Sequence, residues 1–197
     1  MTGSVAAILL AAGKSSRMGK CKQLLPLGTT TVIGRCLEAL VTGGADEILV
    51  VVSEELSAVA EAVRHYPVRI VVNPEYDGDM ASSVRAGRDA LATEANGVIV
   101  ALCDYPLVLA ATIKSLVVEH GDSPGSIIIP CHQERRGHPL LFPREILNEL
   151  ANDLILRDLV QLVPDRIRRL DVDDPGVLLD MDTPEDYQRI CGMIAVN

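Results

Sequence analysis

The chain has 197 residues, a length typical of one domain that can bury a substantial core. Only 3% of its residues are aromatic, so aliphatic side chains must fill the interior. Its formal net charge of −9 argues against a basic face that binds a long nucleic acid, although a local group of cations can still attract a small anion.

The five cysteines are scattered and form no Cys-x-x-Cys pair, which favours isolated thiols over a zinc site or a disulfide framework. Such thiols fit a reducing cytosol, so we expect a cytoplasmic protein. The apolar run near the N-terminus is too short to span a membrane and no basic residue precedes it. We therefore expect a strand there, not a signal peptide, and neither a membrane nor a nucleic acid as partner.

Strand-like and helix-like segments alternate along most of the chain. Apolar runs rich in Val and Ile predict buried strands, and the segments between them have helical composition. In chain order we expect a strand at 5–10, a helix at 31–42, a strand at 47–53, a helix at 54–65, a strand at 68–72, a helix at 81–92, a strand at 97–102, a helix at 109–120 and a strand at 126–130. Beyond residue 130 the rhythm loosens, with short helices at 143–151 and 155–162, a strand at 166–172 and a closing helix at 184–196.

This order predicts a mostly parallel sheet with helices on both faces, in a Rossmann-like three-layer α/β/α sandwich. No repeat or long linker divides the chain, so we expect one domain over 1–197. In such sheets, ligands bind at the carboxyl ends of the strands. Residues that carry chemistry should therefore follow the predicted strands.

The loop after the first strand suits a polyphosphate. Its small residues let backbone N–H groups approach anionic oxygens, and its cations offset their charge. These cations are Lys14, Arg17, Lys20 and Lys22. We interpret the segment as a nucleoside triphosphate loop, with an ordinary basic surface loop as the alternative.

Two better-known phosphate motifs do not fit this loop. Gly13-Lys14-Ser15 resembles the end of a P-loop, but the position that needs the first glycine of that motif is Ile8. A dinucleotide-binding motif is absent as well, because Gly13 and Gly19 lack the third glycine.

A carboxylate follows the strand predicted at 97–102. Asp104 lies in Leu102-Cys103-Asp104-Tyr105-Pro106, a turn stiffened by proline. Mg²⁺ prefers one or two protein carboxylates together with phosphate oxygens and water, so Asp104 is a candidate metal ligand. The alternative is that Asp104 caps the helix predicted from Leu109, but it lies several residues too early for that role.

A second acidic group spans residues 180–186. Thr183-Pro184-Glu185 predicts a helix start, with an N-cap, a proline at the first helical position and acids in the first turn. Asp180 and Asp182 precede this cap, so their side chains are free to point elsewhere.

Two further strand ends carry polar residues. Ser82 and Ser83 lie early in a predicted helix, where N–H groups and hydroxyls can meet a base or a phosphate, although a simple turn and cap is the alternative. Arg135-Arg136-Gly137-His138-Pro139 follows the fifth strand. A lone loop histidine is more often structural, but beside two arginines it suits an anionic acceptor, so Arg135 and His138 are candidate acceptor-binding residues.

Taken together, these motifs resemble the MobA-like nucleotidyltransferases. The loop Ala-Ala-Gly-x-Ser-Ser-Arg-Met-Gly-x-x-Lys-x-Leu-Leu-Pro is similar to the family's triphosphate loop. The Asp-x-Pro at 104, the Asp-Met-Asp-Thr-Pro-Glu-Asp run and the Gly-x-x-x-Ser-Ser segment are similar to further family elements. The Gly-His-Pro at 137–139 is most similar to the molybdenum cofactor cytidylyltransferase branch.

The resemblance implies a nucleotide-diphospho-sugar transferase-like fold and a role for each motif. Arg17 and Lys22 would lie against the phosphates and act in catalysis together with Asp104. Asp104 would bind Mg²⁺, with Asp182 favoured over Asp180 as second ligand. The implied nucleotide-binding residues are Leu10, Ala11, Ala12, Gly13, Lys14, Ser15, Arg17, Lys22, Ser82, Ser83 and Asp104.

The implied activity is transfer of CMP from CTP to a phosphorylated acceptor, of the molybdopterin type, with release of pyrophosphate. Ala12 stands where related guanylyltransferases carry glycine and favours a pyrimidine, whereas Leu10 stands where some cytidylyltransferases have threonine and leaves the base open. The alternatives are a related enzyme that uses GTP or a sugar phosphate, and a non-catalytic nucleotide-sensing or cofactor-delivery module. A molybdoenzyme or a cofactor chaperone is the macromolecular partner that the resemblance suggests.

Overall fold

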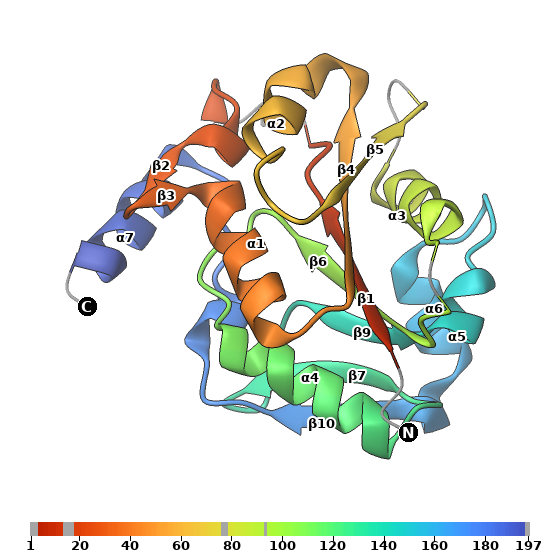
Figure 1. Ribbon diagram of the computed structural model, residues 1–197. Coiled ribbons are helices and arrows are strands. Elements are labelled where there is room, and N and C mark those ends of the chain that lie inside the picture. The colour runs from red at the N-terminus through yellow and green to blue at the C-terminus, as the bar shows by residue number, and fades with distance from the viewer. Residues whose placement is uncertain (1–3, 14–17, 76–78, 93, 196–197) are drawn as a thin grey trace.

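The computed structural model of the chain describes residues 4–13, 18–75, 79–92 and 94–195. Its centre is an eight-stranded sheet with the order β10-β7-β9-β6-β1-β4-β5, in which β8 pairs with β7 (Figure 1). The strands of this sheet are β1 (Val5–Leu10), β4 (Glu47–Ser53), β5 (Arg69–Asn73), β6 (Gly97–Leu102), β7 (Ile127–His132), β8 (Arg135–Arg136), β9 (Leu140–Pro143) and β10 (Ile167–Asp171). A separate hairpin joins β2 (Pro26–Leu27) and β3 (Thr30–Thr31).

The sheet is mostly parallel, as predicted. β5, β4, β1 and β6 pair in parallel, and so do β7 and β10. β9 runs antiparallel to both β6 and β7, and β8 runs antiparallel to β7. The parallel block brings the carboxyl ends of β1, β4, β5 and β6 to one edge of the sheet.

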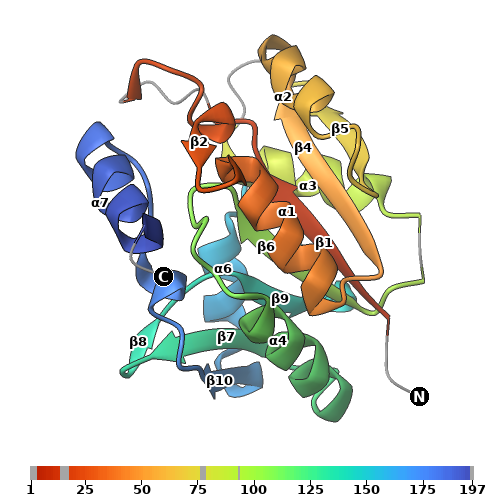
Figure 2. The same cartoon turned by 60° about the vertical axis from the view of Figure 1, so that its left-hand side comes forward.

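Helices cover both faces and give three layers (Figures 1 and 2). One face carries α1 (Val32–Gly43), α2 (Ser57–Ala62), α4 (Ala110–Asp122) and α7 (Pro184–Ala195). The other carries α3 (Met80–Ala90), α5 (Arg144–Asn148) and α6 (Leu156–Leu162). Short 3₁₀ turns complete the chain: η2 (Lys22–Leu24), η3 (Glu54–Leu56), η4 (Pro164–Arg166) and η5 (Pro175–Leu178).

The alternation of side chains along β1 explains the two cores. Ala7 and Leu9 pack with α1 and α4, whereas Ala6 and Ile8 pack with α3 on the opposite face. Residues of a central parallel strand are covered on both sides, so a nearly continuous apolar sequence is required there. The only Phe of the chain, Phe142 on β9, is fully buried in the α3-side core.

Two predicted segments differ from the structure, and the short strands β2, β3, β8 and β9 were not predicted. The helix predicted at 54–65 is a 3₁₀ turn, η3, followed by the short α2, and the helix predicted at 143–151 is the shorter α5. The strand β9 was not predicted at all, because a run of four residues gives too little periodicity to distinguish a strand. Within the described ranges, no helix combines the length and the apolar character needed to cross a membrane.

Candidate active site

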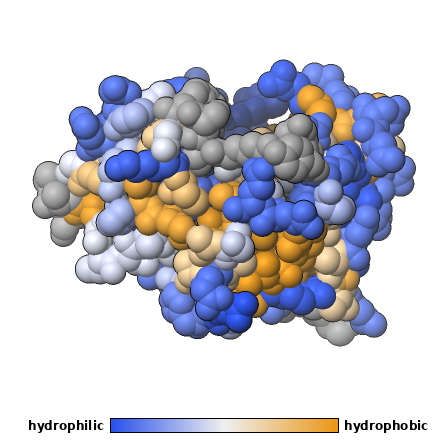
Figure 3. Space-filling view, turned by 90° about the horizontal axis from the view of Figure 1, so that it is seen from above, coloured by the Kyte–Doolittle hydropathy of each residue, from blue (hydrophilic) through white to orange (hydrophobic). Residues whose placement is uncertain are grey.

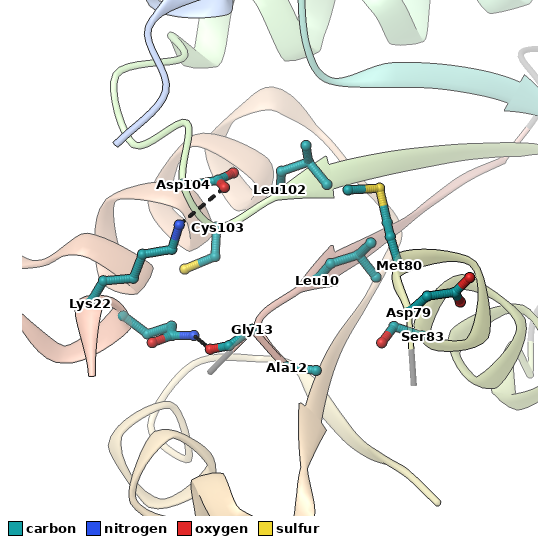
Figure 4. Close-up of a pocket in the computed structure, with 11 residues that line it drawn as sticks. Leu10, Ala12, Gly13, Lys22, Asp79, Met80, Ser83, Leu102, Cys103 and Asp104 are labelled. Carbon is teal, nitrogen blue, oxygen red and sulfur yellow. Dashed lines mark hydrogen bonds and ion pairs between the residues drawn. The ribbon is translucent and has the colours of Figure 1, made fainter. Parts of the chain in front are cut away.

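A cavity of about 190 Å³ opens where β1 and β6 end and α3 begins. Leu10 on β1 pairs with Leu102 on β6, so the two following loops leave the sheet side by side. Figure 4 shows Lys22 and Asp104 at one side of this cavity, Met80, Asp79 and Ser83 at the other, and Leu10 between them. We call it the first cavity. The remaining lining residues are Ala12, Gly13, Gln23, Leu102 and Cys103.

Lys22 connects three distant parts of the chain. Its Nζ donates to Asp104 Oδ2 at 3.1 Å, to Asp182 Oδ1 at 3.0 Å and to the carbonyl of Met181 at 3.2 Å. The Met181 N–H in turn donates to the Asp104 carbonyl at 2.8 Å, and the Met181 side chain is fully buried. The backbone contact and the buried anchor therefore hold the segment at 180–182 beside Asp104.

The charge of Lys22 is well compensated. Burial leaves the residue 9% exposed and lowers the pKa of its amine, but the neighbouring Asp104 and Asp182 outweigh this effect. The net result is a pKa above the ordinary value for lysine, so the ammonium stays protonated at neutral pH.

The two carboxylates fit a divalent cation. Asp104 Oδ1 is buried and has no hydrogen-bond partner in the described part of the chain. A buried carboxylate oxygen without a partner is unfavourable, and a bound metal would satisfy it. Asp182 shares Lys22 with Asp104, whereas Asp180 is exposed. The described residues contain no cluster of three or more metal-ligating side chains, but Mg²⁺ requires only one or two carboxylates when phosphate oxygens and water complete its shell.

Gln23 holds the start of the first loop and was missed by the sequence analysis. Its side chain is 1% exposed, and its Nε2 donates to the carbonyls of Ala11 at 3.0 Å and Gly13 at 2.8 Å. Ala11 itself is buried and its N–H donates to Val51 on β4, so it continues the strand pairing instead of lining the cavity. One buried amide thus fixes two carbonyls of the loop.

Asn73 has a matching role on the other wall. It ends β5 and is buried, and its Nδ2 donates to Ser82 Oγ at 2.9 Å and Ser83 Oγ at 3.0 Å. Asp79 caps α3, because its Oδ1 accepts the Ser82 N–H at 2.8 Å. Of the two serines, Ser83 lines the first cavity. A polar amide directly after an apolar strand was the signal that could have identified Asn73.

The sequence also matches a known family. Residues 7–169 match the MobA-like NTP transferase domain. The chain belongs to this family. The resemblance seen in the sequence motifs is thereby confirmed, and the protein is a nucleotidyltransferase of the MobA-like family.

Relatives of this MobA-like protein carry different names. The nicotine blue oxidoreductase of Paenarthrobacter nicotinovorans is 31% identical, over 94% of this chain and 96% of its own. The molybdenum cofactor cytidylyltransferase of Escherichia coli is 25% identical, over 91% and 92% of the two chains. Among solved structures, a nucleotidyl transferase from Methanothermobacter thermautotroptrophicus is 27% identical with a TM-score of 0.85, over 98% and 99% of the chains. A Mycobacterium tuberculosis protein solved in complex with manganese is 28% identical with a TM-score of 0.79, over 98% and 100%.

Part of the MobA-like loop lies outside the described residues. These positions include Lys14, Ser15 and Arg17, three of the predicted nucleotide-binding residues. The loop residues on either side, Gly13 and Lys22, both line the first cavity.

A second cavity of about 690 Å³ adjoins the first and shares Asp79, Met80 and Leu102 with it. His138 and Arg136 line this second cavity, whereas Arg135 does not. β8 explains the difference, because consecutive residues of a strand point to opposite sides.

His138 lines the second cavity and lies beside Tyr105. Its ring centroid is 4.9 Å from that of Tyr105, and its N–H donates to the Val177 carbonyl at 2.9 Å. Burial lowers the pKa of the imidazole, and Asp104 and Asp180 only partly oppose this. The imidazole is therefore neutral. Its Nδ1 is buried and has no hydrogen-bond partner among the described residues.

The helix start at Thr183 is confirmed. Thr183 Oγ1 accepts the Asp186 N–H at 3.2 Å, and Asp186 Oδ2 accepts the Thr183 N–H at 3.0 Å. This reciprocal pair is a capping box, and its hydrogen bonds hold the pKa of Asp186 below its ordinary value. The cap fixes the chain directly after Asp182, which helps to position that carboxylate.

Proposed function

We propose that this nucleotidyltransferase moves CMP from CTP to a phosphorylated acceptor of the molybdopterin type and releases pyrophosphate. The observation that carries the proposal is the contact of Lys22 Nζ with both Asp104 and Asp182 at the edge of a cavity that Ala12 and Gly13 also line. The choice of CTP and of the acceptor is supported by the relative named molybdenum cofactor cytidylyltransferase and by Gly-His-Pro at 137–139.

The reaction needs no covalent intermediate on the protein. An oxygen of the acceptor phosphate attacks the α-phosphorus of CTP in line, the new P–O bond forms, and the bond to the bridging oxygen of the β-phosphate breaks. Pyrophosphate leaves with that electron pair. A phosphate monoester is largely ionised near neutral pH, so a strong general base is unnecessary.

The residues of the first cavity would bind the triphosphate and balance its charge. Lys22, with Arg17 from the same loop, would contact the phosphates, and Ala12 and Gly13 would let backbone N–H groups approach them. Asp104, with Asp182, would hold Mg²⁺, which when bound neutralises negative charge that develops on the phosphates. The manganese complex of a 28% identical protein supports a divalent metal for this fold.

The serines at the start of α3 would meet the base or sugar of the nucleotide. Ser83 lines the first cavity, and Asn73 holds Ser82 and Ser83 together. We assign them to nucleotide binding with Leu10, and His138 to the acceptor side, where Arg136 and not Arg135 lines the second cavity.

Pyrophosphate release tests this proposal. We expect Asp104→Asn and Lys22→Ala to reduce turnover with CTP and molybdopterin by on the order of 100-fold or more, since each removes a charge that acts on the transferring phosphate. Asp173→Asn, an exposed acid in the loop after β10, is the matched control and should keep full activity. Near wild-type turnover in Asp104→Asn would reject the assignment.

A nucleotide panel separates the alternatives. With Mg²⁺ present, CTP should raise the melting temperature more than GTP, UTP or ATP. A larger increase in melting temperature with GTP would support guanylyl transfer. Turnover with a sugar phosphate would mean that the acceptor is a sugar phosphate instead of a molybdopterin. Tight CTP binding by calorimetry without turnover on any acceptor would support a nucleotide-sensing or delivery module.

The 31% identity to a nicotine blue oxidoreductase favours a second candidate, a reductase. It ranks second because a reductase needs an electron donor, and the loop after β1 lacks the Gly-x-Gly-x-x-Gly dinucleotide motif. Oxidation of NADH or NADPH in the presence of a redox dye, unchanged in Asp104→Asn, would favour it over nucleotidyl transfer.

A further inference from the structure

The turn η5 contacts both segments that flank the candidate site. It follows β10, lies against β7 and β8, and leads into the short stretch that ends at Asp182. One neighbour of η5 is the loop after β8, which carries His138, and the other is the chain that follows Asp104. A turn in this place can set the position of Asp182 relative to both.

The chain after Asp104 is joined to the chain around η5 at two points. The Met181 N–H donates to the Asp104 carbonyl at 2.8 Å, and the Leu109 N–H donates to Asp174 Oδ2 at 2.9 Å. The first residue of one segment thus pairs with the last of the other, so the two segments run antiparallel. Any shift of η5 between these two hydrogen bonds would move the residues that follow it.

Two glycines allow η5 to pack directly on its neighbours. A methyl group on Gly176 would overlap with the carbonyl group of Leu107, and one on Gly137 would lie 2.7 Å from Val177 Cβ, well inside the about 3.5–4.0 Å at which carbon atoms pack. Val177 is fully buried, and its carbonyl accepts the His138 N–H at 2.9 Å. Neither glycine has a positive φ. Close packing, and not backbone conformation, therefore requires glycine at both positions.

The first cavity has an apolar floor. Leu10, Leu102 and Met80 line it, and hydrophobic surface crosses the middle of the face seen in Figure 3. Aliphatic side chains have no donors that could orient a carboxylate. Besides its contact with Lys22, Asp182 thus depends for its position on the backbone contacts of its own segment.

We propose that Gly137 and Gly176 are positioning residues for the metal, because through η5 they hold Asp182 where it can share one divalent cation with Asp104. The inference rests on the proposed function, which assigns a cation to this pair, and adds the part of the fold that keeps the pair together. It also connects the acceptor side to the metal, since Gly137 precedes His138 in the same loop. Residues that hold a metal ligand in place change metal affinity by about 10- to 100-fold when they are replaced.

Calorimetric titration of the full chain with MnCl₂ tests this role without any turnover. We expect Gly137→Ala and Gly176→Ala to raise the dissociation constant of Mn²⁺ on the order of ten-fold, since the added methyl group pushes η5 away from its neighbour. Gly121→Ala is the matched control. A methyl group at Gly121 would meet no other atom within 4 Å, so this variant should bind Mn²⁺ like the wild type.

A double-mutant cycle separates positioning from general damage to the fold. In Asp182→Asn the carboxylate is already lost, so Gly137→Ala should cause no further loss of Mn²⁺ affinity in that background. Val177→Ala provides a second variant, because it leaves a gap at the same contact instead of an overlap. It should weaken Mn²⁺ binding when Asp182 is present and have no effect when Asp182 is replaced.

The outcomes distinguish this inference from the proposed transfer. Unchanged Mn²⁺ affinity in both glycine variants, or an equal loss with and without the Asp182 carboxylate, would overturn the positioning role. If the Mn²⁺ results hold while no nucleotide and acceptor support turnover, the proposed transfer fails and the positioning role stands. A wild type that binds no Mn²⁺ would overturn the positioning role together with the metal role of Asp104 and Asp182.

Discussion

Lys22 supplies one positive charge to two carboxylates, so a metal ion and the ammonium would compete for the negative charge of the same acidic pair. Lys22 Nζ contacts Asp104 Oδ2 and Asp182 Oδ1, both of which are candidate metal ligands. A metal that binds this acidic pair neutralises the charge that holds the lysine, which would then be free to meet the phosphates. The ammonium thus compensates the charge of both carboxylates.

This competition predicts opposite effects of one substitution. Lys22→Met leaves the two carboxylates without their cation, so Mn²⁺ affinity in the absence of nucleotide should rise, on the order of ten-fold. Turnover should nevertheless fall, because the phosphates lose the ammonium. Calorimetric titration with MnCl₂ measures the first effect and pyrophosphate release the second. The control is Lys114→Met, an exposed lysine on α4, and weaker Mn²⁺ binding in Lys22→Met would contradict the competition.

Gln23 acts through the loop rather than on the substrate. Gln23→Glu replaces the amide donor with a carboxylate that faces the carbonyls of Ala11 and Gly13, so both lose their hydrogen bond. We expect the KM for CTP to rise on the order of ten-fold or more, with a smaller effect on kcat. Steady-state kinetics with varied CTP measure this difference, and Gln161→Glu on the exposed side of α6 is the control. An unchanged KM would mean that the loop keeps its shape without Gln23.

At the scale of elements, a buried carboxylate joins η5 to the start of α4. Asp174 Oδ2 accepts the Leu109 N–H at 2.9 Å and the Thr112 hydroxyl at 2.6 Å, and its Oδ1 accepts the Gly176 N–H at 2.9 Å. α4 has no side-chain cap of its own, so Asp174 caps it from a distant segment. The adjacent Val177 carbonyl accepts the His138 N–H, which links this clamp to the second cavity.

Removing the clamp should reduce stability measurably. Asp174→Ala leaves two N–H groups and a hydroxyl without their acceptor, and we expect a loss of about 2–4 kcal/mol in the free energy of unfolding. Urea unfolding followed by circular dichroism measures it. Asp173→Ala, at the exposed neighbouring position, should change stability by less than about 0.5 kcal/mol. A loss of similar size in both variants would show that Asp174 has no special role.

Local patterns predicted some elements well and others poorly. The apolar run of β1 and the cap at Thr183 were predicted because neighbouring residues determine both. The antiparallel β9 was missed, since only its partners β6 and β7 make Leu140–Pro143 a strand. Gln23 and Asp174 were missed for the same reason: their roles depend on carbonyl and N–H groups that are far away in the sequence.

At the scale of the whole molecule, strand order assembles the site. Lys22 is 82 residues from Asp104 and 160 residues from Asp182. β1 and β6 are neighbours and end in register, so the loop with Lys22 and the turn with Asp104 leave the sheet together. The position of Asp104 at this edge was predictable from the parallel order. The contact of Asp182 with Lys22 was not predictable, because no local pattern specifies how the chain returns after η5 over that separation.

Buried histidines make the stability of the whole fold depend on pH. His120 on α4 is fully buried, its Nε2 contacts Asn96 Oδ1 at 3.1 Å, and its ring lies against Gly97 at the start of β6. Burial lowers the pKa of His120, and burial also lowers that of His138. The unfolded chain therefore takes up protons at a higher pH than the folded protein does.

The folded protein should lose stability as the pH falls. Above the ordinary histidine pKa of 6.5 both states are neutral at these positions, and the full stability is present. As the pH falls below 6.5 the unfolded state gains protons first, so the free energy of unfolding decreases until the folded histidines protonate as well. Urea unfolding at pH 8, 7, 6 and 5.5 should show a steady decrease below pH 7. The decrease should be smaller in His120→Gln, which retains a polar group but does not titrate. A wild-type stability that stays constant from pH 8 to 5.5 would mean that neither imidazole is kept neutral by the fold.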